Sequence, residues 1–205
     1  TAVMACIEQA TMDKVAYCAR YGIEITPEQW PSAGMPSEII TDQGREFFGP
    51  RMSELCRRYG LEVLTLPPFR PDCKGAVEKT IDLLQQRYKP MLRGRGVIED
   101  DAQERWATDY RTQATLDLDD FARVVIHSVL YLNSGRLVDG KTPAERWTEL
   151  SPRLMAVDPQ ELYIQTLPRD TAKLTRKGLR INRMWYAPDD ADGLTIGDSY
   201  TVAYD

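Results

Sequence analysis

The chain has 205 residues, 42% of them hydrophobic, and a formal net charge of −5. This length allows one large domain or two modest ones with a real core, and no apolar run is long enough to span a bilayer. Four scattered cysteines without a CxxC pair and a single histidine argue against a zinc site or a disulfide framework, so we expect a cytoplasmic protein with reduced thiols.

The negative net charge argues against a nucleic-acid partner when it is taken alone. The charge is unevenly distributed, however, because residues 99–120 are mainly acidic and residues 169–183 are mainly basic. We expect the acidic segment to be a solvated connector, or alternatively a surface for a partner protein. The sequence begins at Thr1 and ends in the strand-like "SYTVAYD", so we expect a fragment of a longer protein.

Helices and strands alternate along the first 150 residues. Apolar spacing, capping residues and glycine stops predict these elements: a helix over 2–21, a helix start at 26–29, a strand over 37–42 that looks buried, a helix over 49–60, a strand over 61–66, and helices over 76–92, 118–133 and 142–150.

The helix predicted over 76–92 carries an apolar stripe that should pack against the rest of the protein. Its members are Val77, Ile81, Leu84, Tyr88 and Met91. Pro90 should kink or end this helix, since proline cannot donate the backbone hydrogen bond of a helix interior.

The pattern changes after about residue 151. The segments "LYIQTL", "GLRINRMWYA" and "SYTVAY" alternate with turn-forming residues, which predicts a small all-β domain over 151–205 behind an α/β domain over 1–150. We expect the four tryptophans to be packing anchors rather than base-stacking surfaces: Trp30, Trp106, Trp147 and Trp185. His127 is expected to be an ordinary core or surface histidine.

Asp42 and Glu78 stand out among the acidic residues by their context. Asp42 follows an apolar strand, at the end where open α/β sheets place ligands, and Glu78 lies in the first turn of a helix behind a proline-rich loop. Such carboxylates suit Mg²⁺, and paired ions support phosphoryl transfer. Gly44 would allow positive φ or a close backbone approach. The alternative is an ordinary Asp-Gln-Gly turn and a glutamate that favours the helix dipole.

Residues 36–92 resemble the second half of the catalytic core of DDE transposases and retroviral integrases. The resemblance rests on the strand ending in "TDQG", the stretch "PPFRPDCKGAVEK", and the thirty-five residues between Asp42 and Glu78. The flanks "YCARYGIEITPEQW" and "LNSGRLVDGKTPAERW" are similar to the Mu/TnsB group of bacterial transposases, in which a small β-barrel follows the catalytic domain.

The resemblance implies an α/β ribonuclease-H-like (integrase-type) core, incomplete at its N-terminus, followed by a small all-β barrel. It also implies an enzyme that uses Mg²⁺ or Mn²⁺ in a two-metal site to cleave DNA 3′ ends and transfer them to target DNA, with Asp42 and Glu78 as catalytic metal ligands. The implied partners are transposon-end and target DNA, further protomers in a transpososome, and accessory proteins such as an ATPase target selector, all in the bacterial cytoplasm. A non-catalytic DNA-positioning or assembly module with vestigial carboxylates is the alternative.

The family pattern requires a third carboxylate, on an earlier strand. The upstream acidic residues do not follow a strand of the right kind: Glu8, Asp13, Glu24, Glu28 and Glu38. We therefore expect the first aspartate to precede Thr1 and the isolated fragment to be inactive.

Two groups of basic residues are candidates for DNA binding, since lysine and arginine contacts to phosphate position a duplex. The first group flanks Glu78 and comprises Arg70, Lys74 and Lys79; the second lies in the β-rich segment and comprises Arg176, Lys177, Arg180 and Arg183. The alternatives are a solvated loop for the first group and a charged edge strand that discourages aggregation for the second.

Overall fold

The computed structural model describes residues 2–42, 44–67, 75–96, 109–150, 153–190 and 192–204. The helices are α1 (Ala2–Thr11), α2 (Lys14–Ala19), α3 (Pro50–Tyr59), α4 (Gly75–Tyr88), α6 (Leu118–Leu130), α7 (Pro143–Leu150) and α8 (Pro159–Thr166). The strands are β1 (Glu38–Thr41), β2 (Glu62–Thr65), β3 (Arg169–Lys173), β4 (Leu179–Ile181), β5 (Met184–Tyr186) and β6 (Ser199–Ala203). Within these residues, no helix is both long and apolar enough to cross a membrane.

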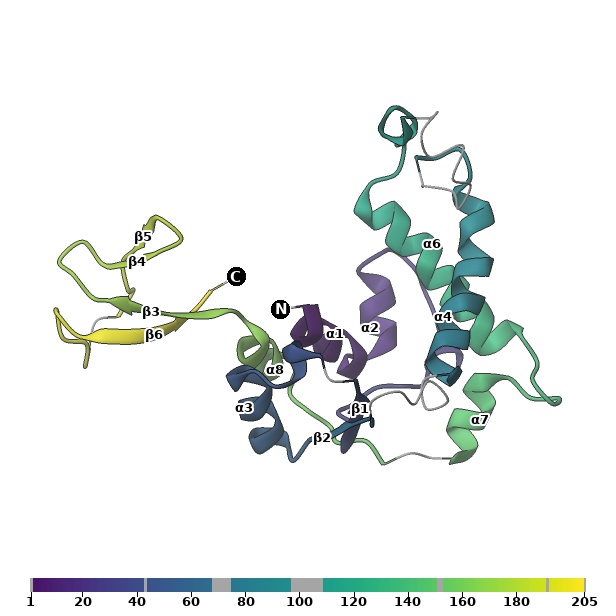
Figure 1. Ribbon diagram of the computed structural model, residues 1–205, viewed down its shortest axis with the longest axis horizontal. Coiled ribbons are helices and arrows are strands. Elements are labelled where there is room, and N and C mark those ends of the chain that lie inside the picture. Colours follow the sequence, from purple (N-terminus) through teal and green to yellow (C-terminus); the bar gives the residue numbers. More distant parts are fainter. Residues whose placement is uncertain are drawn as a thin grey trace.

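Three groups of elements are visible in Figure 1. Helices α2, α4, α6 and α7 lie on one side, and α1, α3 and α8 surround the short strands β1 and β2 in the middle. Strands β3 to β6 form an arm on the other side. The mixed α/β organisation predicted for the first part of the chain is therefore present.

Strands β1 and β2 pair in parallel, with Ile39 opposite Val63 and Ile40 opposite Leu64. Alternation places Ile39 and Val63 on the face that packs against the core. The other face is open, since Ile40 is 62% exposed. The prediction of a buried strand was thus wrong for one of its two faces.

The main core lies between α1, α3 and α8. It includes Met4 and Ile7 from α1, Met52 and Leu55 from α3, and Leu162 from α8. A second, smaller cluster joins α2 to α6 through Cys18, Ile23, Ile126 and Leu130. Trp30 packs against this second cluster, as expected for a packing anchor.

The helix predicted over 2–21 is two helices, and Lys14 explains the break. Its ammonium group is buried and donates to the carbonyl oxygens of Gln9, Ala10 and Met12 at 3.0, 2.8 and 2.6 Å. These hydrogen bonds satisfy carbonyl groups at the C-terminal end of α1. The Asp13 carboxylate accepts from the Ala16 amide and so caps the start of α2. Burial lowers the pKa of Lys14, and the nearby Asp13 carboxylate partly opposes this effect.

Helix α4 ends at Tyr88 and continues as a 3₁₀ turn from Lys89 to Leu92, which confirms a change of helix geometry near Pro90. It lies beside α6 (Figure 1), where the Tyr88 and Phe121 rings meet edge to face at 5.8 Å. The predicted stripe is only partly covered, because Val77 and Ile81 remain 62% and 50% exposed.

The last part of the chain departs from the predicted barrel in two ways. The segment that includes "LYIQTL" is the helix α8, which Asp158 caps by accepting from the Glu161 amide at 2.8 Å and which begins at Pro159. Strands β3 and β6 form one two-stranded antiparallel sheet and β4 and β5 another, so a closed barrel is not seen among the described residues. The domain boundary near residue 150 stays a prediction.

Helix α3 holds this last part in place through three polar contacts. Arg169, at the start of β3, donates to both Glu54 carboxylate oxygens at 2.9 and 2.8 Å. Arg58 pairs with Glu161 of α8, and Arg51 donates to the carbonyl oxygen of Thr166. The three α3 residues occur at helical spacing on one face, so this face binds both α8 and the first strand of the arm.

Met52 tests the main core, because its side chain is 1% exposed. Met52→Ala should lower the free energy of unfolding by about 2–5 kcal/mol, through lost burial and the cavity that remains. Leu118→Ala is the matched control, since Leu118 is 85% exposed, and it should change that energy by less than about 0.5 kcal/mol. Urea denaturation followed by circular dichroism measures both, and equal effects would contradict the assigned core.

Candidate functional site: two carboxylates at one pocket

Asp42 lies directly beyond the carboxyl end of β1. Thr41, the last residue of the strand, is buried, and its hydroxyl donates to the Asp42 carbonyl oxygen at 2.9 Å. The Asp42 carboxylate accepts from the Gly44 amide at 3.2 Å. The side chain is exposed, and the backbone beneath it is held by the end of the strand.

Glu78 lies in the first turn of α4, where a negative charge is favoured by the helix dipole. Its side chain and that of Asp42 line the same pocket, which has a volume of about 410 Å³. The remaining lining is mainly apolar and comprises Ile40, Thr41, Phe47, Leu66 and Val77. The structure thus brings together the two carboxylates that the sequence singled out. Phe47 and Leu66 are pocket residues that the sequence analysis did not identify.

Gly44 does not have the backbone conformation that the sequence analysis allowed for it. Its φ is outside the left-handed region that glycine favours, unlike that of Gly60 at φ 64°. A Cβ atom at position 44 would lie 2.7 Å from a Glu46 carboxylate oxygen, the flexible end of an exposed side chain. The observed contribution of Gly44 to the site is its amide hydrogen bond to Asp42.

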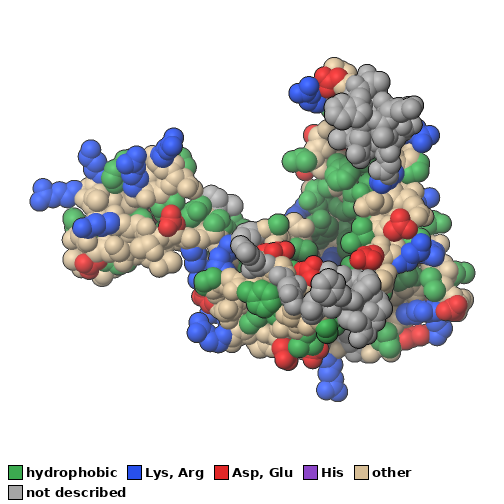
Figure 2. Space-filling view, in the orientation of Figure 1, with side chains coloured by type: hydrophobic (Ala, Val, Ile, Leu, Met, Phe, Trp, Pro, Cys, Tyr) green, Lys and Arg blue, Asp and Glu red, His purple; other side chains and the backbone are tan. Residues whose placement is uncertain are grey.

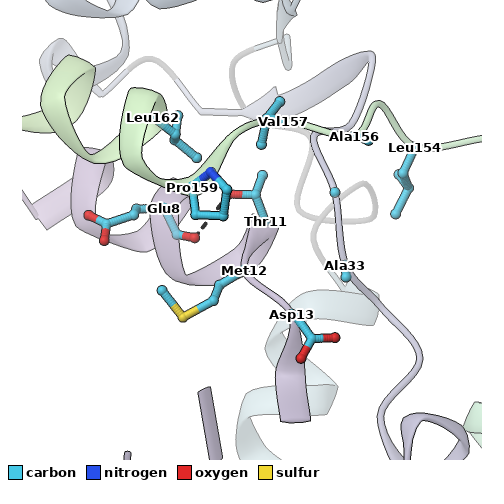
Figure 3. A pocket seen from close by; sticks show the side chains of 11 residues that line it. Glu8, Thr11, Met12, Asp13, Ala33, Leu154, Ala156, Val157, Pro159 and Leu162 are labelled. Atoms are coloured by element: carbon cyan, nitrogen blue, oxygen red, sulfur yellow. Dashed lines mark hydrogen bonds between the residues drawn. The ribbon is translucent and has the colours of Figure 1, made fainter. Parts of the chain in front are cut away.

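The upstream carboxylates Glu8 and Asp13 line a different pocket, of about 290 Å³. Figure 3 shows their carboxylates lying apart from each other. Glu8 accepts from the Thr166 hydroxyl at 3.2 Å, and Asp13 caps α2. In the part of the chain that the structure describes, no three or more His, Cys, Asp or Glu side chains are grouped to hold a metal.

The first group of predicted DNA-binding residues is described only in part. Lys79 is exposed on α4, and its ammonium lies 3.3 Å from the Asp82 carboxylate one turn along the helix. Arg70 and Lys74 lie outside the described residues, as does Trp106. His127 is exposed on α6, in agreement with a surface histidine.

The second group gathers on the arm, where Figure 2 shows a concentration of Lys and Arg side chains. We call Arg176, Lys177, Arg180 and Arg183 the hairpin cluster. All four are exposed, in the turn before β4, in β4 itself, and in the turn after it. Trp185 lies beside them and is 47% exposed, so its prediction as a packing anchor was wrong.

The two carboxylates thus share a pocket at the carboxyl end of β1, the position at which open α/β sheets place ligands. Residues 1–94 match the family model of the TnsB C-terminal domain. The chain is also 27% identical over 195 residues to the Tn7 transposition protein TnsB of Escherichia coli, covering 87% of this chain and 27% of TnsB. The chain is thus similar to TnsB over most of its length, in agreement with the resemblance found in its sequence.

Two further similarities are weaker. An uncharacterized protein of Caenorhabditis elegans, K02A2.6, is 26% identical over 89 residues, which are 43% of this chain and 7% of that protein. The catalytic core domain of BIV integrase matches at 21% identity with a TM-score of 0.37, over 56% of this chain and 60% of the integrase chain. That fit is too loose to bear on the fold. The chain spans about a quarter of TnsB, so the activity of a whole transposase is a matter for proposal.

Two glycine substitutions compare the cost of a left-handed backbone conformation with the cost of a contact to a neighbouring side chain. Gly60→Ala should cost about 1–2 kcal/mol of stability, because a Cβ atom opposes its left-handed conformation, although no other atom lies within 4 Å of that Cβ. Gly44→Ala should cost less than about 0.5 kcal/mol, since only the movable end of Glu46 is in the way. Thermal denaturation compares the two, and a larger loss from Gly44→Ala would show that position 44 is conformationally restricted.

Proposed function

We propose that this chain is part of a DDE-type transposase with a ribonuclease-H-like catalytic core. The complete protein cleaves DNA at transposon ends to leave a 3′-OH, and that hydroxyl then attacks a phosphodiester of the target and displaces the 3′ oxygen of the broken strand. The observation that carries the proposal is that Asp42 and Glu78, distant in sequence, line one pocket. The similarity to TnsB, named as a transposition protein, supports it independently.

The donor atoms at this pocket suit a hard divalent cation. Asp42 and Glu78 supply carboxylate oxygens, and Mg²⁺ is usually held by only one or two carboxylates together with water and substrate phosphate. A pair of such ions, when bound, would stabilise both the attacking and the leaving oxygen of phosphoryl transfer. Asp42 and Glu78 would hold such an ion, since β1 fixes the backbone of Asp42 and the first turn of α4 fixes that of Glu78.

We propose that the third carboxylate comes from a segment that precedes Thr1 in the longer protein. Glu8 and Asp13 line a separate pocket and are engaged in contacts of their own. A chain with two of the three carboxylates would not join DNA alone. Robust Mg²⁺-dependent strand transfer by the isolated 205 residues would therefore contradict this part of the proposal.

We propose that the hairpin cluster and Lys79 position DNA by contacts to phosphate, and that Arg70 and Lys74 do the same. Four exposed cations on adjacent short elements of the arm support this role. Arginine is well suited to it, because its planar guanidinium matches phosphate geometry. The partners are transposon-end and target DNA, other transposase protomers, and an accessory ATPase that selects the target.

Neutral substitutions of the two carboxylates test the catalytic proposal in the full-length protein. Asp42→Asn or Glu78→Gln should reduce strand transfer by about 100-fold or more, since a lost metal ligand removes several kcal/mol of transition-state stabilisation. Binding of labelled end DNA, followed by gel shift, should persist. Glu149→Gln is the matched control, because Glu149 is an exposed glutamate on another helix, α7, and pairs with Lys141.

Two further outcomes distinguish a catalytic role of the carboxylates from a non-catalytic one. Glu149→Gln should retain strand transfer within about twofold, because Glu149 is exposed and does not line the pocket. Near-normal joining by both carboxylate variants would instead support a non-catalytic module that positions DNA or assembles the transpososome, with vestigial carboxylates.

Removal of the hairpin cluster should weaken DNA binding in a salt-dependent manner. Replacing all four residues by glutamine should lower affinity, and the slope of log K against log salt should fall by about one for each lost phosphate contact. Fluorescence anisotropy at several salt concentrations measures this. Arg111→Gln is the control, since Arg111 is an exposed arginine paired with Asp109. An unchanged slope would favour the edge-strand alternative.

A further inference from the structure

The β4–β5 hairpin exposes three consecutive large apolar side chains. Met184, Trp185 and Tyr186, which form β5, are 57%, 47% and 44% exposed. Tryptophan and tyrosine usually bury most of their surface. Because side chains alternate along a strand, Trp185 faces one side of the hairpin, and Met184 and Tyr186 face the other. Sequence reasoning could not distinguish this position from a packing anchor, because the aromatic residue types are the same.

Arg180 lies directly across the hairpin from Trp185. The two residues are register partners in the antiparallel pair, and the guanidinium carbon of Arg180 lies 5.8 Å from the centre of the Trp185 ring. The neighbouring Ile181 is 4% exposed and points to the other face. Alternation therefore directs Arg180 and Trp185 to the solvent side, where a flat aromatic surface and a planar cation are presented together.

The turn after β4 adds a cation in an unfavourable conformation. Asn182 and Arg183 have φ values of 48° and 69°, so both central residues of this two-residue turn are left-handed. Such turns favour Asn-Gly, because glycine has no Cβ atom to oppose the second position. Here an arginine occupies that position, and strain of this kind is commonly retained at sites of function.

The charge within the hairpin segment itself is of one sign, although Asp170 and Asp189 border it. Residues 171–188 contain Lys173 and the hairpin cluster and no acidic residue. A positively charged surface with exposed aromatic rings is the usual means of binding single-stranded nucleic acid, because every base offers a flat face and the backbone offers phosphates. An acidic peptide would match the charge, but it would not account for the half-exposed ring of Trp185 as directly.

We propose that the β4–β5 hairpin binds unpaired nucleotides of a DNA substrate, with a base stacked on Trp185 and adjacent phosphates held by Arg180 and Arg183. This inference rests on the proposed DNA binding by the hairpin cluster and specifies the DNA structure that it prefers. Unpaired nucleotides occur wherever a DNA end carries a single-stranded overhang. A duplex would be held by phosphate contacts alone, since its bases are stacked within the helix.

The test measures the affinity of the whole 205-residue chain for three DNA probes. The probes are an oligothymidine strand, a blunt duplex, and the same duplex extended by a short thymidine overhang, each measured by fluorescence anisotropy. Trp185→Ala should weaken binding of the single strand and the overhang about 5- to 150-fold, the range for loss of one stacked base. Binding of the blunt duplex should change less than about twofold, because the phosphate contacts remain.

The chain offers a matched control for the aromatic residue. Tyr131 is 44% exposed, and the guanidinium carbon of Arg87 lies 4.0 Å from its ring centre. Tyr131→Ala removes an aromatic ring beneath an arginine elsewhere in the protein and should leave overhang binding unchanged. Trp185→Phe retains an aromatic face and should retain most of the preference for the overhang.

Arg183→Gly separates a loss of DNA binding from a loss of folding. Glycine suits the left-handed position, so this variant should keep or raise the melting temperature while it weakens binding of the overhang. A variant that melts earlier than the wild type would contradict the assigned turn conformation and with it the argument from strain.

Two results would contradict the binding of unpaired bases, and a different result would contradict DNA binding by the hairpin cluster. Equal weakening of blunt and overhang probes by Trp185→Ala would show that no unpaired base stacks there, with DNA binding itself intact. Binding of a glutamate-rich, tyrosine-containing peptide that depends on Trp185, without any preference for the overhang, would assign the hairpin to a protein partner. Failure of the hairpin cluster to affect any DNA probe would instead contradict the proposed DNA-binding role.

Discussion

The parallel pairing of β1 with β2 is the constraint on which the candidate site depends. Parallel strands require a crossover, and α3 supplies it between Gly49 and Gly60. The ladder extends past the strands, since the Leu66 amide donates to the Thr41 carbonyl at 2.9 Å. Both strands therefore end at one edge, where Asp42 follows the first. The chain that leaves the second strand enters α4 and brings Glu78 to the same pocket.

The crossover helix also connects this pocket to the arm. One side of α3 contributes Met52 and Leu55 to the core, and another binds α8 and β3 through Arg58 and Glu54. The contact between Arg169 and Glu54 is largely shielded on the arginine side, whose side chain is 23% exposed. Ion pairs that are partly buried and hydrogen-bonded orient their elements more strongly than fully exposed ones. The arm that carries the hairpin cluster thus contacts, through Arg169 of β3, the helix that connects β1 to β2.

Much of the site was predictable because its signals are local. Gly60 ends α3 in the left-handed conformation, and the apolar strands on either side are short and well bounded, so Asp42 and Glu78 could be placed without tertiary information. The break between α1 and α2 could not be predicted, since it depends on Lys14 folding back onto carbonyls two to five residues away. The start of α8 was visible in the sequence, because Asp158 followed by Pro159 is a typical helix start. The apolar residues that follow also suit a strand, and they led to the wrong prediction.

The charge of the protein shows why a mean value is a poor guide to its partners. A net charge of −5 would oppose DNA if it acted as a single charge, yet the Debye length is only about 8 Å at physiological ionic strength. Beyond that distance acidic residues elsewhere on the chain are largely screened, and a phosphate at the arm responds to the cations beside it. The five cations in residues 171–188, a run without a carboxylate, therefore contribute more to the potential at the hairpin than acidic residues elsewhere on the chain. Because Trp185 is exposed within that run, the same short hairpin combines attraction for the backbone with a flat surface for a base, two requirements that bulk composition does not reveal.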